Sequence, residues 1–213
     1  MGEFFQYMAK NWSVILDKTG EHVGLAFSAV GLACLVGIPV GLLITRNKKL
    51  SNGVIGVANV LQTIPSLAMF AIVLPLLGIG TRNATFTLFL YALLPIIKNT
   101  YIGIKNVDPS IIEAARGMGM SRFQILYKVE MPLAVAVIMG GVRIATVTGI
   151  GIATIGTLIG AGGLGTLIYQ GIGMVNYPMM FAGVIPAALL ALLTDFVLGW
   201  FEKLLTSKGI ATT

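Results

Sequence analysis

Long apolar runs are the feature of this sequence that most constrains its fold. Hydrophobic residues make up 56% of the 213 residues, and charged residues only 10%. A helix needs ~20 apolar residues to cross the hydrocarbon core of a bilayer, so the chain has room for about five or six spans and little else. Ordinary soluble domains have about 25% charged residues. The sequence therefore predicts an all-α integral membrane protein with short loops.

Five apolar segments are the predicted membrane spans, separated by charged residues, turns or glycines. They cover about Val23–Thr45, Val54–Leu77, Ala84–Ile104, Leu133 or Ile144 to Ile159, and Pro178–Phe201. A short turn around Thr81–Asn83 precedes the third span, and a glycine-rich loop, Gly160–Asn176, precedes the fifth. Residues 23–205 are thus predicted to form one membrane domain, followed by a cytoplasmic tail at 206–213.

Residues 1–22 differ from the spans because charged and apolar side chains alternate there at helical spacing. Trp12 and Ile15, for example, are interleaved with Lys10 and Asp17. This pattern predicts an amphipathic helix on the membrane surface, and we expect no cleavable signal peptide. His22 stands at the edge of the first predicted span, where an interfacial histidine is expected rather than a metal ligand.

The longest polar stretch between apolar runs is Val107–Pro132. Asp108 is a good N-cap, and proline suits the first helical position that Pro109 occupies. A short helix is therefore predicted from Pro109 to about Arg116.

Glycines and a second cap follow this helix. Gly117 and Gly119 end it, and Ser121 with Gln124 has the spacing of a capping box. A second short helix is therefore predicted to run toward Pro132. The polar stretch as a whole is a helix, a glycine elbow and a helix.

This stretch resembles the EAA motif of binding-protein-dependent ABC importer permeases. That motif is Glu-Ala-Ala, three residues, Gly, nine residues, then Ile-x-Leu-Pro. The matching residues are Glu113, Ala114, Ala115, Gly119, Val129, Met131 and Pro132, with Val and Met in place of the usual Ile and Leu. In the family this loop is the coupling helix, which docks into a groove of a separate ATPase. The resemblance implies that role for Glu113, Ala114, Ala115, Arg116, Gly117, Met118, Gly119, Met120 and Ser121.

The chemistry of the loop suits docking independently of the family. Its alanines and glycines present little side chain, so another protein's surface could approach the backbone closely. Charged residues around them would supply polar contacts: Glu113, Arg116 and Arg122. The alternative is a charged loop that is only solvated.

Four further segments resemble the osmoprotectant branch of these permeases, the OpuB/OpuC type. They are Gln62–Met69, Leu74–Gly80, Tyr91–Tyr101 and Ala153–Gly165. The resemblance implies a MetI-like type I ABC importer permease fold in the bacterial cytoplasmic membrane and import of solutes such as glycine betaine, carnitine or choline. It also implies a second permease subunit, by analogy a related but different chain, two ATPase subunits and an extracytoplasmic solute-binding protein.

Several residue types needed for other functions are scarce or absent. No G-x-x-x-x-G-K-[ST] loop occurs, so ATP and Mg²⁺ are expected in the partner ATPase rather than in this chain. Cys34 is the only cysteine and His22 the only histidine, so we predict no metal site, no cofactor and no enzyme activity. The basic residues lie scattered at span ends, which favours contact with membrane lipid and not nucleic acid.

Polar residues within the spans are candidates for the translocation pathway. Asn59, Gln62, Thr63 and Ser66 follow the i, i+3, i+4, i+7 spacing of one helical face on the second span. The fourth span has a looser stripe: Thr146, Thr154 and Thr157. Such groups are costly against lipid, so they should line a water-filled path or form interhelical hydrogen bonds.

Arg143 and Asp195 are the charges predicted to lie within spans. Both fall in the halves assigned to the cytoplasmic side, so we expect them to pair or to extend to the inner interface. A proton relay is the alternative for these two residues.

Basic residues also indicate the orientation. If the polar stretch is cytoplasmic, nine basic residues lie inside: Arg46, Lys48, Lys49, Lys105, Arg116, Arg122, Lys128, Lys203 and Lys208. Three lie outside: Lys10, Lys18 and Arg82. This bias predicts the N-terminus outside and the C-terminus inside.

The leading hypothesis is a permease subunit that is switched between inward- and outward-facing states by a separate ATPase. An ABC permease for methionine or another small polar solute is the alternative within the same class. Outside that class, the chain could be a membrane scaffold that only recruits a cytosolic partner.

Overall fold

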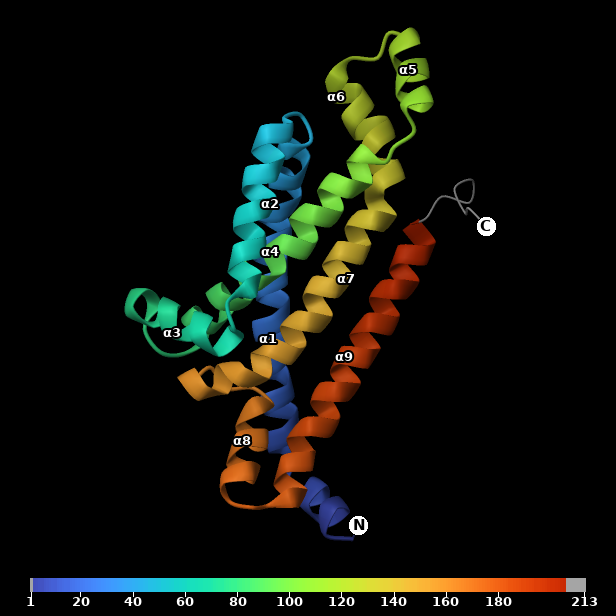
Figure 1. Ribbon diagram of the computed structural model, residues 1–213. Coiled ribbons are helices and arrows are strands. Elements are labelled where there is room, and N and C mark those ends of the chain that lie inside the picture. The colour runs from blue at the N-terminus through green and yellow to red at the C-terminus, as the bar shows by residue number, and fades with distance from the viewer. Residues whose placement is uncertain (1, 206–213) are drawn as a thin grey trace.

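The computed structural model describes residues 2–205, which form a bundle of helices (Figure 1). The helices are α1 (Gly2–Ile44), α2 (Lys48–Thr63), α3 (Ser66–Leu77), α4 (Thr81–Lys105), α5 (Pro109–Gly117), α6 (Arg122–Ile125), α7 (Met131–Ile155), α8 (Gly165–Gly173) and α9 (Tyr177–Leu205). A π-helical turn, Leu126–Glu130, joins α6 to α7, and a 3₁₀ turn, Gly156–Ile159, follows α7. The predicted tail at 206–213 lies outside the described residues.

The helices contain enough long apolar segments for a protein that crosses the membrane several times. Four are long and apolar enough to span: Gly2–Ile44, Thr81–Lys105, Arg122–Ile159 and Tyr177–Leu205. The pair α2 and α3, bent by 103°, passes the same test together and would make a fifth span. The predicted all-α fold with about five spans is confirmed.

The helix that contains the first predicted span begins much earlier than that span. α1 has one non-helical residue, Asn11 (φ −113°, ψ 18°), and then runs without a break to Ile44. Residues 12–22 are therefore helical, as predicted, and continuous with the first predicted span. His22 is fully buried within the protein, and its Nε2 lies 3.0 Å from the carbonyl oxygen of Ile150.

The second predicted span, Val54–Leu77, is broken near its middle. α2 ends at Thr63, Ile64 is extended (φ −70°, ψ 127°), and α3 starts after Pro65. Proline has no N–H and disfavours helical geometry in the residue before it, which explains the position of the break. α3 consequently turns away from α2 by 103° (Figure 1).

The helix that contains the fourth predicted span starts before either position predicted for that span. The capped helix at Arg122 does not stop at Pro132 but continues through the π-helical turn into α7. In that turn the N–H of Met131 donates to the oxygen of Leu126, five residues earlier. We attribute the continuity to this wider turn, because a proline ring clashes with a carbonyl in a regular α-helix.

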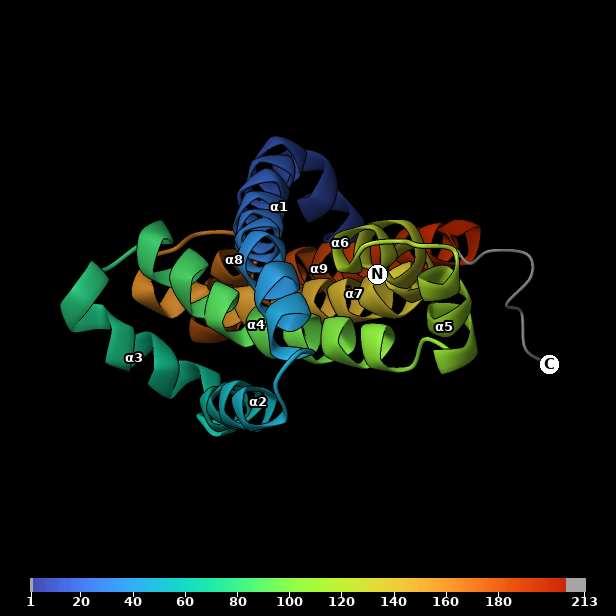
Figure 2. The ribbon, with the colours of Figure 1, turned by 90° about the horizontal axis from the view of Figure 1, so that it is seen from above.

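α4 forms the centre of the bundle, between α1 and α7, and α9 packs against α7 and α8 (Figures 1 and 2). Small residues allow these close crossings. A Cβ at Gly41 would lie 2.6 Å from Cβ of Thr100, and one at Gly141 would lie 2.7 Å from the oxygen of Pro95. Such small residues are typical of helix packing within membranes.

The loop predicted at Gly160–Asn176 contains a helix, α8. Three glycines with left-handed backbone precede it: Gly160 (φ +74°), Gly162 (φ +81°) and Gly163 (φ +79°). They turn the chain sharply enough for α8 to fold back against α9.

Candidate functional site

The polar loop has the predicted shape of a helix, an elbow and a helix. Asp108 caps α5: its Oδ1 accepts a 2.8 Å hydrogen bond from the backbone N–H of Ser110, which holds the pKa of this carboxyl below its usual value. Gly119 forms the elbow with a φ of +82°. Ser121 and Gln124 form the capping box, because each side chain accepts a hydrogen bond from the other's backbone N–H, at 3.3 and 2.7 Å.

Most of the residues predicted to couple to an ATPase are accessible on this loop. The exposed ones are Glu113, Ala114, Arg116, Gly117, Met118, Gly119 and Ser121. Met120 is half-buried, while Ala115 is only 1% exposed and packs inward. Ala115 can therefore support the shape of the loop, but its side chain is not at the surface that a partner would touch.

Two aromatic residues near the elbow were not among the predicted coupling residues. Phe123 and Tyr127 are 74% and 69% exposed, and their rings are stacked with centroids 6.4 Å apart. Met118 is exposed to a similar degree. Apolar side chains four residues apart in a polar, extramembrane helix are the sequence signal that could have identified this pair.

A cavity of about 870 Å³ lies beneath the elbow. It is lined by Arg46, Ile112, Arg116, Met120, Arg122, Phe123, Ile125, Leu126 and Glu130. Arg46 follows α1 and forms a 3.2 Å ion pair with the nearly buried Glu130 of the π-helical turn. The loop is thus tied to two spans, α1 and α7.

α7 connects the loop to the rest of the membrane domain. Arg143 of α7 forms two hydrogen bonds to Asp195 of α9, from Nε to Oδ1 at 2.6 Å and from Nη2 to Oδ2 at 2.7 Å. Its Nη1 also lies 3.4 Å from Oε2 of Glu202. The structure therefore brings the two predicted intramembrane charges together, and a displacement of α7 would act directly on α9.

The polar stripe predicted on the second span is divided by the bend at Pro65. Asn59, Gln62 and Thr63 are exposed at the end of α2, whereas Ser66 begins α3. Nε2 of Gln62 donates a 2.9 Å hydrogen bond to the backbone oxygen of Tyr91 on α4. The stripe thus has exposed groups that could line a path and one interhelical hydrogen bond.

The predicted threonines lie in different environments. Thr146 is buried, and its hydroxyl donates to the oxygen of Val142 within α7. Thr154 is half-buried and donates to Gly151. Thr157 shares a 2.9 Å hydrogen bond with Thr166, which starts α8. The structure does not bring these three threonines together with the α2 stripe in one polar cluster.

At the end of the molecule opposite the elbow, α1 holds the glycine turn. Oε2 of Glu21 accepts a 2.7 Å hydrogen bond from the N–H of Gly163, and Lys18 contacts both oxygens of the same carboxylate. A Cβ at Gly162 would lie only 2.5 Å from Oε2 of Glu21. Glycine is therefore needed here both for its backbone angle and for the close approach.

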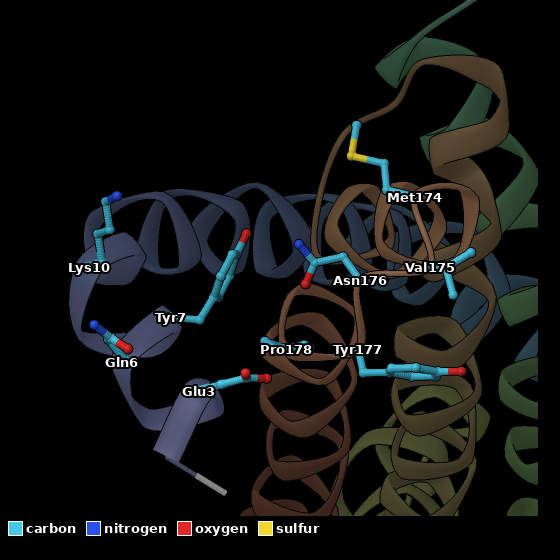
Figure 3. Close-up of a pocket in the computed structure, with 9 residues that line it drawn as sticks. All are labelled: Glu3, Gln6, Tyr7, Lys10, Met174, Val175, Asn176, Tyr177 and Pro178. Atoms are coloured by element: carbon cyan, nitrogen blue, oxygen red, sulfur yellow. The ribbon is translucent and has the colours of Figure 1, made fainter.

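A shallow pocket of about 590 Å³ lies at this same end (Figure 3). Figure 3 shows that the start of α1 and the turn between α8 and α9 line it, through Glu3, Gln6, Tyr7, Lys10, Met174, Val175, Asn176, Tyr177 and Pro178. Val175 has a left-handed backbone (φ +54°), and the side chain of Asn176 caps α9 by accepting from the N–H of Met179.

Lys98 is a further charge within a span that was not among the predicted ones. It lies on α4, seven residues before the helix ends at Lys105, and its side chain is exposed. Its position inside the apolar run Ala84–Ile104 is the signal that could have identified it. Within residues 2–205, no group of three or more His, Cys, Asp or Glu side chains is close enough to hold a metal ion.

Comparison with known proteins agrees with this geometry. Residues 37–207 match the family described as "Binding-protein-dependent transport system inner membrane component". The chain is 46% identical to a carnitine transport permease protein, OpuCB, of Listeria monocytogenes, over 97% of this chain and 94% of the relative. It is 45% identical to a glycine betaine/carnitine/choline transport system permease protein, OpuCD, of Bacillus subtilis strain 168, over 94% and 88%.

Solved structures show the same architecture. An inward-facing structure of the MetNI methionine ABC transporter aligns with a TM-score of 0.82 and 26% identity, covering 91% of this chain and 96% of that one. An amino acid ABC transporter aligns with a TM-score of 0.73 at 20% identity, covering 93% and 97%, and shows the fold alone. The predicted MetI-like permease fold is confirmed, and the chain belongs to the family of inner membrane components of binding-protein-dependent transport systems.

Proposed function

We propose that this chain is the permease subunit of an ABC importer for quaternary ammonium osmoprotectants. The observation that carries the proposal is the near full-length similarity, above 40% identity, to permeases named for carnitine, glycine betaine and choline transport. The resemblance to methionine permeases is limited to 26% identity in the structural comparison, so we favour osmoprotectants over methionine as cargo.

In this proposal, the exposed elbow couples the permease to ATP hydrolysis. An ATPase subunit docks against Glu113, Arg116 and the stacked pair Phe123 and Tyr127, which combine charged and apolar contact at a cytoplasmic surface. Closure of the ATPases then moves the elbow, and the continuous helix that begins at Arg122 carries the displacement across the membrane. Such a partner can shift the equilibrium between two transporter states only through contacts that differ between them.

The complete importer contains two permease subunits, two ATPases that bind ATP and Mg²⁺, and an extracytoplasmic binding protein. The second permease is a related but different chain. Selection of the solute in water falls to the binding protein, because quaternary ammonium groups are held by aromatic faces and the aromatic residues of this chain are dispersed. The permease lies in the bacterial cytoplasmic membrane with its N-terminus outside and its C-terminus inside.

Uptake of labelled solutes tests the proposal. Cells that lack other osmoprotectant importers would carry the complete set of partner subunits, with or without this gene, at high osmolarity. We expect gene-dependent uptake of glycine betaine, carnitine or choline, and none of methionine. Methionine uptake alone, or no uptake by an importer whose subunits are shown to be assembled, would overturn the osmoprotectant assignment.

A further inference from the structure

The charged residues inside the spans differ in whether they form ion pairs. Arg143 and Asp195 neutralise each other across α7 and α9. Lys98 forms no ion pair with any of residues 2–205, although it too lies within a spanning helix. An ammonium group is costly in hydrocarbon, so an exposed lysine within a span should face water or another protein.

The position of Lys98 along α4 determines how far its charge lies from the end of the helix. Seven residues separate it from Lys105, the last residue of α4, which corresponds to ~10 Å along a helix axis. The side chain of Lys105 is also exposed, and Lys105 is the last residue of the helix. Lys98 therefore lies within the apolar part of α4 and not at its end.

The side of α4 that carries Lys98 is also the side that meets the polar end of α2. Residues seven apart lie on nearly the same face of a helix, so Lys98 shares a face with Tyr91. The hydroxyl of Tyr91 donates to the oxygen of Ile64, and its backbone oxygen accepts from Gln62. Figure 1 shows α2 and α4 diverging toward the end where α5 lies. Lys98 thus lies about two helical turns beyond Tyr91, on the face of α4 that meets the end of α2.

We infer that Lys98 faces the translocation path and is a specificity-determining residue, which favours solutes that carry a carboxylate over solutes that are only cationic. This inference rests on the proposed function and deepens it. Glycine betaine and carnitine each have a carboxylate that an ammonium group attracts, and the attraction is strongest in a narrow, poorly solvated path. Choline has no such group, and its positive charge is repelled by Lys98.

Replacement of Lys98 in the assembled importer tests this directly. Lys98→Met should lower uptake of carnitine and glycine betaine relative to choline by about tenfold, the effect of losing one charge-assisted contact. Lys98→Arg should largely restore the ratio, because it keeps the charge. Lys105→Met is the matched control, since it removes an exposed cation from the same face of α4 and should leave the ratio unchanged.

The possible outcomes separate the inference from the proposed function. Equal loss of all three uptakes in Lys98→Met, with assembly intact, would assign Lys98 a structural role and overturn the inference alone. So would an unchanged ratio. If the wild-type importer carries none of the three solutes, the proposed function fails, and the inference fails with it.

A second measurement does not depend on transport. With Cys34 replaced by Ala, Lys98→Cys should react with a water-soluble thiol reagent in the nucleotide-free importer, because the path admits water. Ile144→Cys, at an exposed apolar position on α7, is the comparison and should react slowly, because lipid or the second permease subunit covers such a position in the assembled importer. Equally slow reaction of both would place Lys98 away from the path.

Discussion

At the scale of single residues, close backbone contacts place strict demands on a few glycines. A Cβ at Gly165 would lie 2.0 Å from the oxygen of Thr154, where α8 crosses the end of α7. Gly151, on α7 itself, has no atom within 4 Å of its Cβ position. The two glycines look alike in the sequence, but only one is required by packing.

This difference predicts opposite results for the same substitution. Gly165→Ala must displace backbone and should destabilise the protein by at least ~2 kcal/mol. Gly151→Ala should be neutral or should stabilise it by up to ~1 kcal/mol, since alanine is the better helix former. Thermal unfolding of the purified variants in detergent measures both. Equal midpoints would mean that α8 does not cross α7 as closely as the structure has it.

The Arg143–Asp195 pair is the other residue-scale feature with a direct test. Asp195→Asn leaves Arg143 without its bidentate partner in the membrane domain, so folding yield should fall more than substrate preference changes. Asp17→Asn, at an exposed position, is the control and should fold normally. The double variant Arg143→Met with Asp195→Met should recover part of the yield, because it removes both charges of the bidentate pair and costs Glu202 only its 3.4 Å contact with Arg143. Normal yield of Asp195→Asn would argue against a structural role for the pair.

At the scale of elements, the glycine elbow determines how the loop presents itself to an ATPase. Gly119→Asp adds a Cβ at a φ of +82° and a negative charge beside the docking surface. The permease should still insert and fold, while ATPase copurification and uptake should both be lost. Gly53→Ala is the control, because Gly53 lies on α2, outside the loop, and a Cβ there meets no atom within 4 Å. Normal assembly and uptake of Gly119→Asp would show that the elbow is not the docking element.

Replacement of Gln62 tests whether the polar end of α2 lines the translocation path. Gln62→Leu removes the hydrogen bond to Tyr91 and an exposed amide, so uptake should fall several-fold at normal expression. Val60→Leu changes an exposed apolar residue on the same helix and should have little effect. Wild-type uptake by Gln62→Leu at normal expression would count against the assignment of this residue to the pathway.

The elements also show what the sequence could and could not predict. Local signals identified the Asp108 cap, the elbow at Gly119 and the Ser121 capping box, because neighbouring residues alone determine these features. Hydropathy could not distinguish a straight span from the one bent at Pro65. The sequence also predicted that the second helix of the loop would run only as far as Pro132. A single π-helical turn instead lets the helix continue past this proline. Assigning the basic residues to the loops on each side of the membrane did not identify Lys98. Its role depends on which face of α4 packs against other helices.

At the scale of the whole molecule, five crossings, with α2 and α3 counted as one bent span, predict that the two ends of the chain lie on opposite sides of the membrane. Figure 1 shows the start of α1 at one end and the elbow near the end of α9 at the other. The excess of basic residues at the elbow end predicts that this end is cytoplasmic.

An alkaline phosphatase fused before α1 should therefore be active, and one fused after residue 213 should not be. A fluorescent protein at the same two positions should give the reverse pattern, because it becomes fluorescent only on the cytoplasmic side. An active phosphatase at the C-terminus would invert the orientation, and the elbow could then no longer meet a cytoplasmic ATPase.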